Sequence, residues 1–183
     1  MNFAPPTAPP RELRRVLVLG GCGSGKSTFA RRLGDLTGLP VVHLDREYFS
    51  PGWVEPEREV WVRKLDEIAA RDRWIIDGNH VRKAFPTRSE RADLAILLDM
   101  PTWRCIWRVI GRVVAWNGRV RYDMAPGCEE HFDAGFLWYT LRYRATQLPV
   151  IREALRAFRG ELVTLRSPAE VERYLVSYES GGR

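Results

Sequence analysis

The chain has 183 residues, enough for one domain with a single hydrophobic core. Its hydrophobic fraction of 45% is ordinary for a globular protein, and no apolar run approaches the roughly 18 to 20 residues that span a bilayer, so no membrane partner is expected. The formal net charge of +6 comes mostly from arginine, which makes it weak support for a nucleic-acid partner; a positive field also suits a polyphosphate ligand.

The first twelve residues are rich in proline and alanine and lack the apolar centre of a signal peptide. We expect residues 1–12 to be a disordered tail and residues 13–183 to form one domain. Cys22, Cys105 and Cys128 are an odd and scattered set. Such a set predicts a reducing, cytoplasmic location rather than a disulfide framework.

Apolar runs and breaker residues then predict an alternation of strands and helices along the chain. Strands are expected at 16–19, 39–45, 73–77, 93–99 and 161–165. Helices are expected at 26–37, 56–71, 102–116, 132–158 with a break at Pro149, and 168–178, with a short helix and loop at 80–90. The alternation predicts an α/β fold with a parallel sheet covered on both faces.

Two further expectations concern packing. The helix at 102–116 should turn Ile106, Val109, Ile110 and Val113 inward, and most of the seven tryptophans should pack in the core or against neighbouring helices. Residues 117–131 are polar and contain two glycines and a proline, so they are expected to form a loop or lid.

A phosphate-binding motif follows the first strand. It comprises Gly20, Gly21, Cys22, Gly23, Ser24, Gly25, Lys26 and Ser27, and it matches G-x-x-x-x-G-K-[ST]. The glycines allow backbone N–H groups to surround an anion at the start of the following helix. Lys26 can reach the β- and γ-phosphates of ATP, and the Ser27 hydroxyl can ligate Mg²⁺. The alternative is a glycine-rich turn without a ligand, and the lysine, one of only three in the chain, argues against it.

Three aspartates end predicted strands and should lie at the carboxyl edge of the sheet, where open α/β sheets bind ligands. Asp77 is the first choice for Mg²⁺, with a cap or turn role as the alternative. Asp45 is a candidate to take a proton from a substrate hydroxyl, or else a structural residue. Asp99 is expected to cap a turn and helix.

Arginines recur at four-residue spacing at positions 104, 108 and 112, which places them on one helix face. Arg119 and Arg121 follow in the predicted lid. Arg108, Arg112 and these two residues are candidates to stabilise negative charge on a transferring phosphoryl group. The alternative is a solvated basic stripe.

The sequence resembles the adenylate-kinase-like P-loop kinases, and within them the family labelled DNA topology modulation protein, FlaR-related. The resemblance rests on Gly20 to Thr28, His43-Leu44-Asp45 with Tyr48, Pro51-Gly52-Trp53, Trp74 to Asn79, Leu98 to Pro101, Ala125 to Cys128, and Arg166-Ser167-Pro168. It implies a three-layer P-loop NTPase fold with five parallel strands in the order 2-3-1-4-5.

The same resemblance implies an acceptor-binding region at about 46–72 and a mobile lid at about 117–131. Residues 45–49 also show a shorter similarity to uridine kinases, which implies that Asp45 is a base and that the loop from Arg166 to Pro168 flanks adenine. Thr28 is expected to contact the nucleotide as the last residue of the phosphate loop. After Asp77-Gly78 the chain departs from the Asp-Gly-Phe-Pro-Arg pattern of monophosphate kinases, because Arg82 comes one residue later and the proline is absent.

These features favour an ATP- and Mg²⁺-dependent kinase that phosphorylates a small-molecule acceptor, which could be a nucleotide, a nucleoside or another hydroxyl compound. A regulatory or nucleic-acid-linked ATPase is the alternative, favoured by the basic charge and the family label. A nucleotide-binding scaffold with little turnover is a third possibility.

Overall fold

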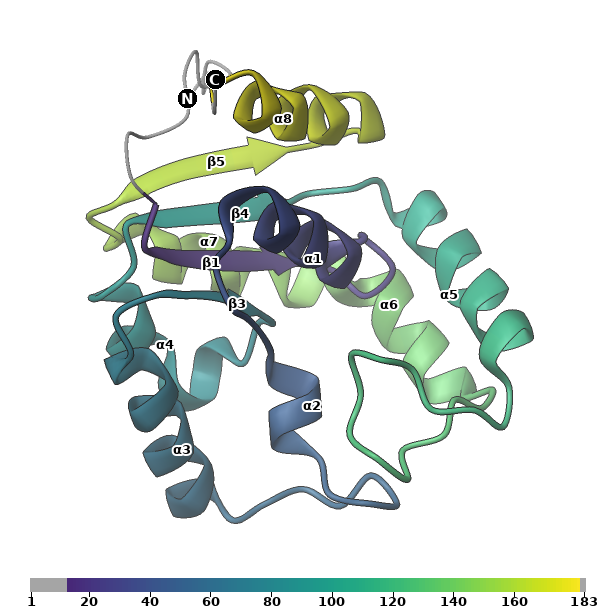
Figure 1. The fold of residues 1–183 in the computed structure, drawn as a ribbon. Helices are drawn as coiled ribbons and strands as arrows, with labels where there is room; N and C mark the ends of the chain where they lie inside the picture. The colour runs from purple at the N-terminus through teal and green to yellow at the C-terminus, as the bar shows by residue number, and fades with distance from the viewer. Residues whose placement is uncertain (1–12, 182–183) are drawn as a thin grey trace.

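The computed structural model describes residues 13–181, without the side chains of 82–84 and 180–181, so the predicted N-terminal tail lies outside the described residues. Five strands form one parallel sheet in the order β2-β3-β1-β4-β5 (Figure 1), which confirms the predicted fold class. The strands are β1 Arg15–Gly20, β2 Val41–His43, β3 Trp74–Asp77, β4 Leu94–Leu98 and β5 Glu161–Leu165. The central strands read as continuous apolar runs because helices cover both of their faces.

The helices divide between the two faces of the sheet. They are α1 Lys26–Thr37, α2 Leu44–Tyr48, α3 Arg58–Ala70, α4 Val81–Ser89, α5 Thr102–Trp116, α6 Ala134–Thr146, α7 Leu148–Arg156 and α8 Pro168–Gly181. Alternate residues of β1 pack into separate clusters, as the period of two in a strand requires. Val16 and Val18 join α1 and α8, while Leu17 and Leu19 join residues of α3, α4 and α7.

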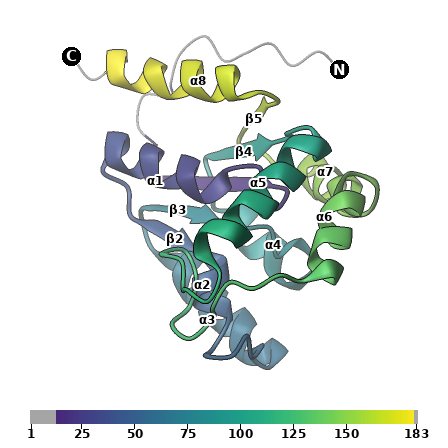
Figure 2. The same cartoon turned by 90° about the vertical axis from the view of Figure 1, so that its right-hand side faces the viewer.

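The carboxyl ends of the strands all point to one edge of the molecule. α5, α6 and the loop between them stand beyond that edge, and α2 leaves the sheet there (Figures 1 and 2). In the parallel register, Val18 of β1 lies beside Asp77 of β3, and Gly20 lies beside Leu98 of β4. The end of β1 is therefore flanked by the ends of β3 and β4.

Several predicted boundaries differ from the structure. The strand expected at 39–45 is only Val41–His43, because the chain turns at once into the short helix α2. The helix expected at 132–158 does break as predicted, but at Gln147 rather than at Pro149. Pro149 lies in the first turn of the second helix, where its missing N–H is tolerated.

Two packing predictions were wrong in part. α5 buries Val109 as predicted, and Cys105 with it, but Ile106 and Val113 are only half-buried and Ile110 is exposed. Trp103 and Trp107 on the same helix are 59% and 68% exposed. The reason is that α5 projects past the sheet and packs on α6. The face of α5 that carries Trp103 and Trp107 is therefore not covered by the described residues. Within residues 13–181, none of the helices has both the length and the apolar character of a membrane span.

Candidate nucleotide and acceptor site

The predicted phosphate loop connects β1 to α1. Gly25 caps α1 with a left-handed backbone (φ 95°), and Gly23 (φ 73°) approaches α5 so closely that a Cβ would lie 2.3 Å from the carbonyl oxygen of Cys105. Only glycine satisfies both conditions. The Nζ of Lys26 donates to the carbonyl oxygen of Gly21 at 2.9 Å. The lysine side chain therefore folds back over the loop that it follows.

Asn79, just after β3, is bonded to the first residue of this loop. Its Oδ1 accepts from the Gly20 N–H at 3.0 Å, and its Nδ2 donates to the Gly20 carbonyl at 2.8 Å and to the Tyr143 hydroxyl at 3.2 Å. The buried Arg88 donates in turn to the Asn79 carbonyl oxygen. Burial lowers the pKa of Arg88 to about 9, so the guanidinium still carries its charge at neutral pH. In the sequence, only the Asp-Gly-Asn segment after a buried strand pointed to these hydrogen bonds.

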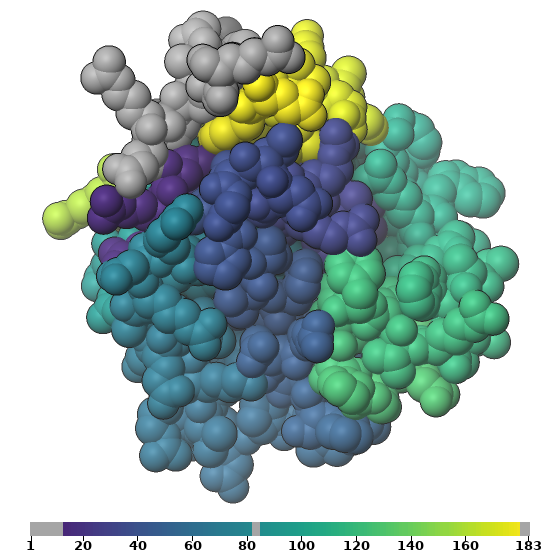
Figure 3. Space-filling view, viewed as in Figure 1, coloured from purple at the N-terminus to yellow at the C-terminus, as the bar shows by residue number. Residues whose placement is uncertain are grey.

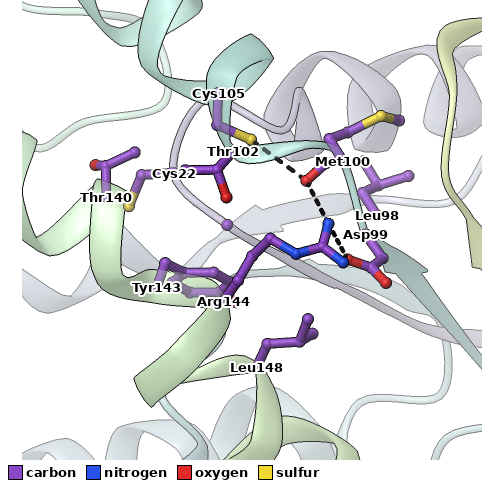
Figure 4. A pocket seen from close by; sticks show the side chains of 11 residues that line it. Cys22, Leu98, Asp99, Met100, Thr102, Cys105, Thr140, Tyr143, Arg144 and Leu148 are labelled. Atoms are coloured by element: carbon purple, nitrogen blue, oxygen red, sulfur yellow. Dashed lines mark hydrogen bonds and ion pairs between the residues drawn. The ribbon is translucent and has the colours of Figure 1, made fainter.

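Figure 4 shows the small space behind the loop, where Cys22 lies near Cys105. Burial raises the pKa of the Cys22 thiol, although Lys26 opposes the shift. Asp99 was predicted to cap a helix, and this prediction was wrong. Its carboxylate instead forms ion pairs with Arg144 (3.1 Å) and Arg152 (2.8 Å), and the residue before α5 makes no side-chain cap.

Asp77 is buried at the end of β3 beside the loop. Its Oδ2 accepts from His43 Nδ1 at 2.8 Å, and its Oδ1 has no hydrogen-bond partner among the described residues. A carboxylate only accepts, so His43 carries its proton on Nδ1. The His43 ring in turn meets the lid edge-on at Tyr122, with ring centres 5.7 Å apart.

Asp45 lies in the first turn of α2 and is also paired with a histidine. Its Oδ1 accepts from His80 Nε2 at 3.2 Å, and its side chain stays 56% exposed to the cavity. Desolvation raises the pKa of Asp45, but the hydrogen bond and charge of His80, with Lys26 and Arg121, outweigh it and hold the pKa below its ordinary value.

His80 itself is held firmly in place. Its backbone is left-handed (φ 33°), a conformation that costs a residue with a side chain about 1 kcal/mol or more. The imidazole ring packs against the rings of Tyr48 (4.7 Å between centres) and Trp61 (5.2 Å). Sequence reasoning missed His80, because its partner Asp45 is distant in the chain and because the sequence does not reveal its left-handed backbone.

The predicted arginines have different surroundings. Arg108 donates to the Ser24 carbonyl of the phosphate loop at 3.0 Å. Arg112 contacts Oε1 of the buried Glu130 through Nε (3.0 Å) and Nη2 (2.9 Å). Arg121 contacts Glu130 Oε2 at 2.9 Å and Asp123 Oδ2 at 3.1 Å.

Three other arginines are not brought to the cavity among the described contacts. Arg104 lies over the ring of Trp103, and Arg119 is exposed in the loop. Arg166 is exposed too, although Pro168, two residues later, lines the cavity.

The loop at 117–131 is docked on the turn that follows α2. Gly52 N–H donates to the Gly127 carbonyl at 3.0 Å, Trp53 Nε1 donates to the Glu129 carbonyl at 3.1 Å, and the Cys128 thiol contacts the Ser50 carbonyl at 3.3 Å. Figure 3 shows this loop and the α2 segment side by side at the surface. The predicted lid and the predicted acceptor region form one wall.

A cavity of about 1160 Å³ lies between these segments. Its lining includes Ser24 to Thr28 of the phosphate loop together with Asp45, Asp77 and His80. Pro168, Val171 and Glu172 of α8 also line it, and Phe49 and Trp53 come from the predicted acceptor region. The volume exceeds that of most single-ligand sites, so it has room for a nucleotide and a second small molecule.

No family model matches the chain. Among solved structures, it is similar to a shikimate kinase from Bacteroides thetaiotaomicron (TM-score 0.57, 13% identity, covering 92% of this chain and 97% of that one). It is also similar to a shikimate kinase from Acinetobacter baumannii in complex with shikimate (TM-score 0.54, 18% identity, 93% and 95%) and to a putative kinase from Chloroflexus aurantiacus (TM-score 0.53, 13% identity, 94% and 100%). The chain therefore has the fold of small P-loop kinases.

Proposed function

We propose that the protein is an ATP-dependent phosphotransferase that moves the γ-phosphoryl group of Mg·ATP to a hydroxyl group of a small acceptor. One observation carries the proposal. A single cavity contains both a phosphate-binding loop with its lysine and, near it, a carboxylate, Asp45, that keeps one oxygen free of described partners.

The phosphate loop suits the triphosphate of ATP. Its N–H groups and the start of α1 supply positive potential, and Lys26 and Arg108 add charge near the same loop. Gly20 to Thr28 would contact the nucleotide, and Pro168 and Val171 would flank its base together with the Arg166 loop.

Ser27 and Asp77 would hold Mg²⁺. The buried Oδ1 of Asp77, which lacks a hydrogen-bond partner in the described part of the chain, fits a cation, because an unpaired buried carboxylate oxygen is otherwise unfavourable. Bound Mg²⁺ would neutralise charge on the phosphate oxygens.

Asp45 would orient the acceptor hydroxyl and take its proton. As the hydroxyl oxygen bonds to the γ-phosphorus and the bond to the departing ADP oxygen breaks, the proton passes to Oδ2 of Asp45, which has no partner among the described hydrogen bonds. Arg108 and Arg112 on α5 and Arg121 in the lid line the cavity and are candidates to stabilise the charge that develops, whereas Arg119 is exposed and does not line it. General-base assistance of this kind contributes roughly 10²- to 10⁴-fold to rate.

Two further assignments belong with this proposal. The motifs at Gly20 to Thr28 and Ala125 to Cys128 support membership in the FlaR-related family of adenylate-kinase-like proteins. The cysteines at 22, 105 and 128 are free thiols, which supports a cytoplasmic location.

The test is an incubation of the pure protein with Mg·ATP and a pooled library of nucleosides, nucleotides, sugars and small alcohols. ADP release and new phosphorylated masses are followed together, with Lys26→Ala as the control. A phosphorylated product that disappears in the variant establishes the kinase. ADP release without any product contradicts the proposal and indicates an ATPase.

The nucleic-acid-linked ATPase gains no support from the described contacts. Arg108 and Arg112, which would have formed its basic stripe, bond to Ser24 and Glu130 instead. No second function is proposed.

A further inference from the structure

We infer, on the basis of the proposed kinase function, that the acceptor is an uncharged or cationic compound with hydroxyl or ammonium donors and an apolar face. By the same reasoning, the site disfavours phosphorylated and carboxylated acceptors.

The first argument comes from the cations. Of the described Lys and Arg side chains that line the cavity, Lys26 and Arg108 bond to the phosphate loop, and Arg32 pairs with Glu172. Only Arg112 and Arg121 remain for the acceptor.

Both remaining arginines already form ion pairs with carboxylates, although the Nε of Arg121 makes no hydrogen bond among the described residues. Arg112 places two nitrogens on Glu130, and Arg121 contacts both Glu130 and Asp123. The side chain of Glu130 is only 6% exposed, so these ion pairs are poorly screened by solvent. An anionic acceptor would have to share these guanidinium groups with the buried carboxylate of Glu130, which repels a second negative charge.

The second argument comes from unpaired carboxylate oxygens. Asp123 lines the cavity and is buried, and its Oδ1 has no hydrogen-bond partner among the described residues. Asp45 accepts from His80 through Oδ1 alone among the described hydrogen bonds. Ionised carboxylates accept hydrogen bonds and repel anions, so both positions select for hydroxyl or ammonium groups.

The third argument comes from aromatic rings. Phe49 and Trp53 line the cavity with their ring centres 5.2 Å apart, and the Trp53 indole is fixed by its bond to the Glu129 carbonyl. His131 lies edge-on to Trp53 at 6.2 Å. A fixed aromatic wall next to carboxylates suits the apolar face of a sugar, nucleoside or amino alcohol.

The test compares acceptors in matched pairs that differ in one anionic group. Suitable pairs are a nucleoside and its 5′-monophosphate, a hexose and its aldonic acid, and an amino alcohol and the hydroxy acid of similar size. We expect kcat/KM to favour the uncharged or cationic member by about 100-fold or more. A preference for the anionic member overturns the inference and leaves the kinase standing.

A variant addresses the cause directly. Glu130→Gln keeps the shape of the side chain but releases Arg112 and Arg121 from their shared carboxylate, so the preference should shift toward anionic acceptors by about tenfold. Glu129→Gln, at the exposed neighbouring position, is the matched control and should leave the preference unchanged. A folded Glu130→Gln protein with the wild-type preference contradicts the argument.

Asp123→Asn covers the case in which Glu130→Gln does not fold. This variant should raise the KM for uncharged and cationic acceptors and leave the KM for ATP unchanged. An unaltered acceptor KM counts against the inference. Binding of the same pairs, measured by calorimetry with Mg²⁺ and a non-hydrolysable ATP analogue, does not depend on turnover. Selective binding of the uncharged or cationic members without transfer would mean that the proposed function fails while the ligand class stands.

Discussion

Two aspartates in the cavity each contact a histidine, yet their surroundings differ. Asp77 is buried with His43, whereas Asp45 is open to the cavity and paired with His80. The buried residue suits an ion held beside the phosphate loop, and the open one can meet an acceptor. Both aspartates could be identified from the sequence, but their different burial could not, because burial depends on which elements pack around each strand end.

His80 should act as a positioning residue for Asp45. His80→Asn tolerates the left-handed backbone but has too short a side chain to replace the Nε2–H, and we expect kcat/KM to fall about 10- to 100-fold. His80→Gln can still present a donor and should recover part of the loss.

The pH profile separates this role from simple instability. Because His80 lowers the pKa of Asp45, its removal should raise that pKa, and the acid limb of the profile should move to higher pH. Lys26 and Arg121 remain as the other charges that act on Asp45. An unmoved acid limb, with Asn and Gln equally impaired, would indicate that His80 only supports the fold.

Asp77→Asn tests the cation site. Removing the charge should raise the Mg²⁺ concentration needed for half-maximal activity by about tenfold or more, with the acceptor KM unchanged. The stability of the ligand-free protein should not fall, because the variant removes a buried carboxylate with one unpartnered oxygen. Both quantities can be measured, by a Mg²⁺ titration of activity and by thermal unfolding. A clear loss of ligand-free stability with a normal Mg²⁺ response would assign Asp77 a structural role.

At the scale of elements, the sequence predicted α1, α5 and β5 with accurate bounds, because glycines, prolines and a uniform apolar period mark them. The sequence-based prediction failed at β2 and α2, because the chain passes there directly from a short strand into a helix, with no glycine or proline to mark the boundary. The phosphate loop was predictable because its chemistry is local. The Glu130 bridge between α5 and the lid was not, because it joins residues that only the fold brings together.

The docking of the lid on the 50–54 turn can be tested with two glycines of the same loop. Gly118 (φ 68°) has open space where a Cβ would lie, whereas a Cβ on Gly127 (φ 76°) would meet the Pro51 Cβ at 2.9 Å. Gly118→Ala should lower the free energy of unfolding by about 1 kcal/mol through backbone strain alone. Gly127→Ala should cost about 1 to 2 kcal/mol more and raise the acceptor KM. Denaturant unfolding and acceptor kinetics measure the two effects, and equal values for both variants would mean that the lid contact carries no energy.

At the scale of the whole molecule, tryptophan serves in three environments. Trp61 and Trp74 are in the core, Trp53 borders the cavity, and Trp103 and Trp107 lie on the outer face of α5. Composition alone suggested that most of them pack in the core or against neighbouring helices, since large aromatic residues are mostly buried on average. The position of α5 beyond the sheet edge overrides that tendency.

A comparison of two tryptophan variants tests this division. Trp61→Ala should lower the free energy of unfolding by about 3 to 5 kcal/mol, because it empties a buried site. Trp107→Ala should change it by about 0.5 kcal/mol or less, because the ring is mostly exposed. Urea denaturation followed by circular dichroism measures both, and a large effect of Trp107→Ala would indicate that the outer face of α5 is covered in solution.

The phosphate loop has a practical consequence that follows from its lysine. Lys26 lies over the loop with its Nζ on the Gly21 carbonyl, while Lys64 pairs with Glu47 away from the loop. The chain has only three lysines, and all its other Lys and Arg positions are arginine. An amine-reactive acyl-phosphate analogue of ATP would thus find few competing amines. Mass spectrometry of the labelled peptide could report nucleotide occupancy of this protein in crude extracts, before any acceptor is known.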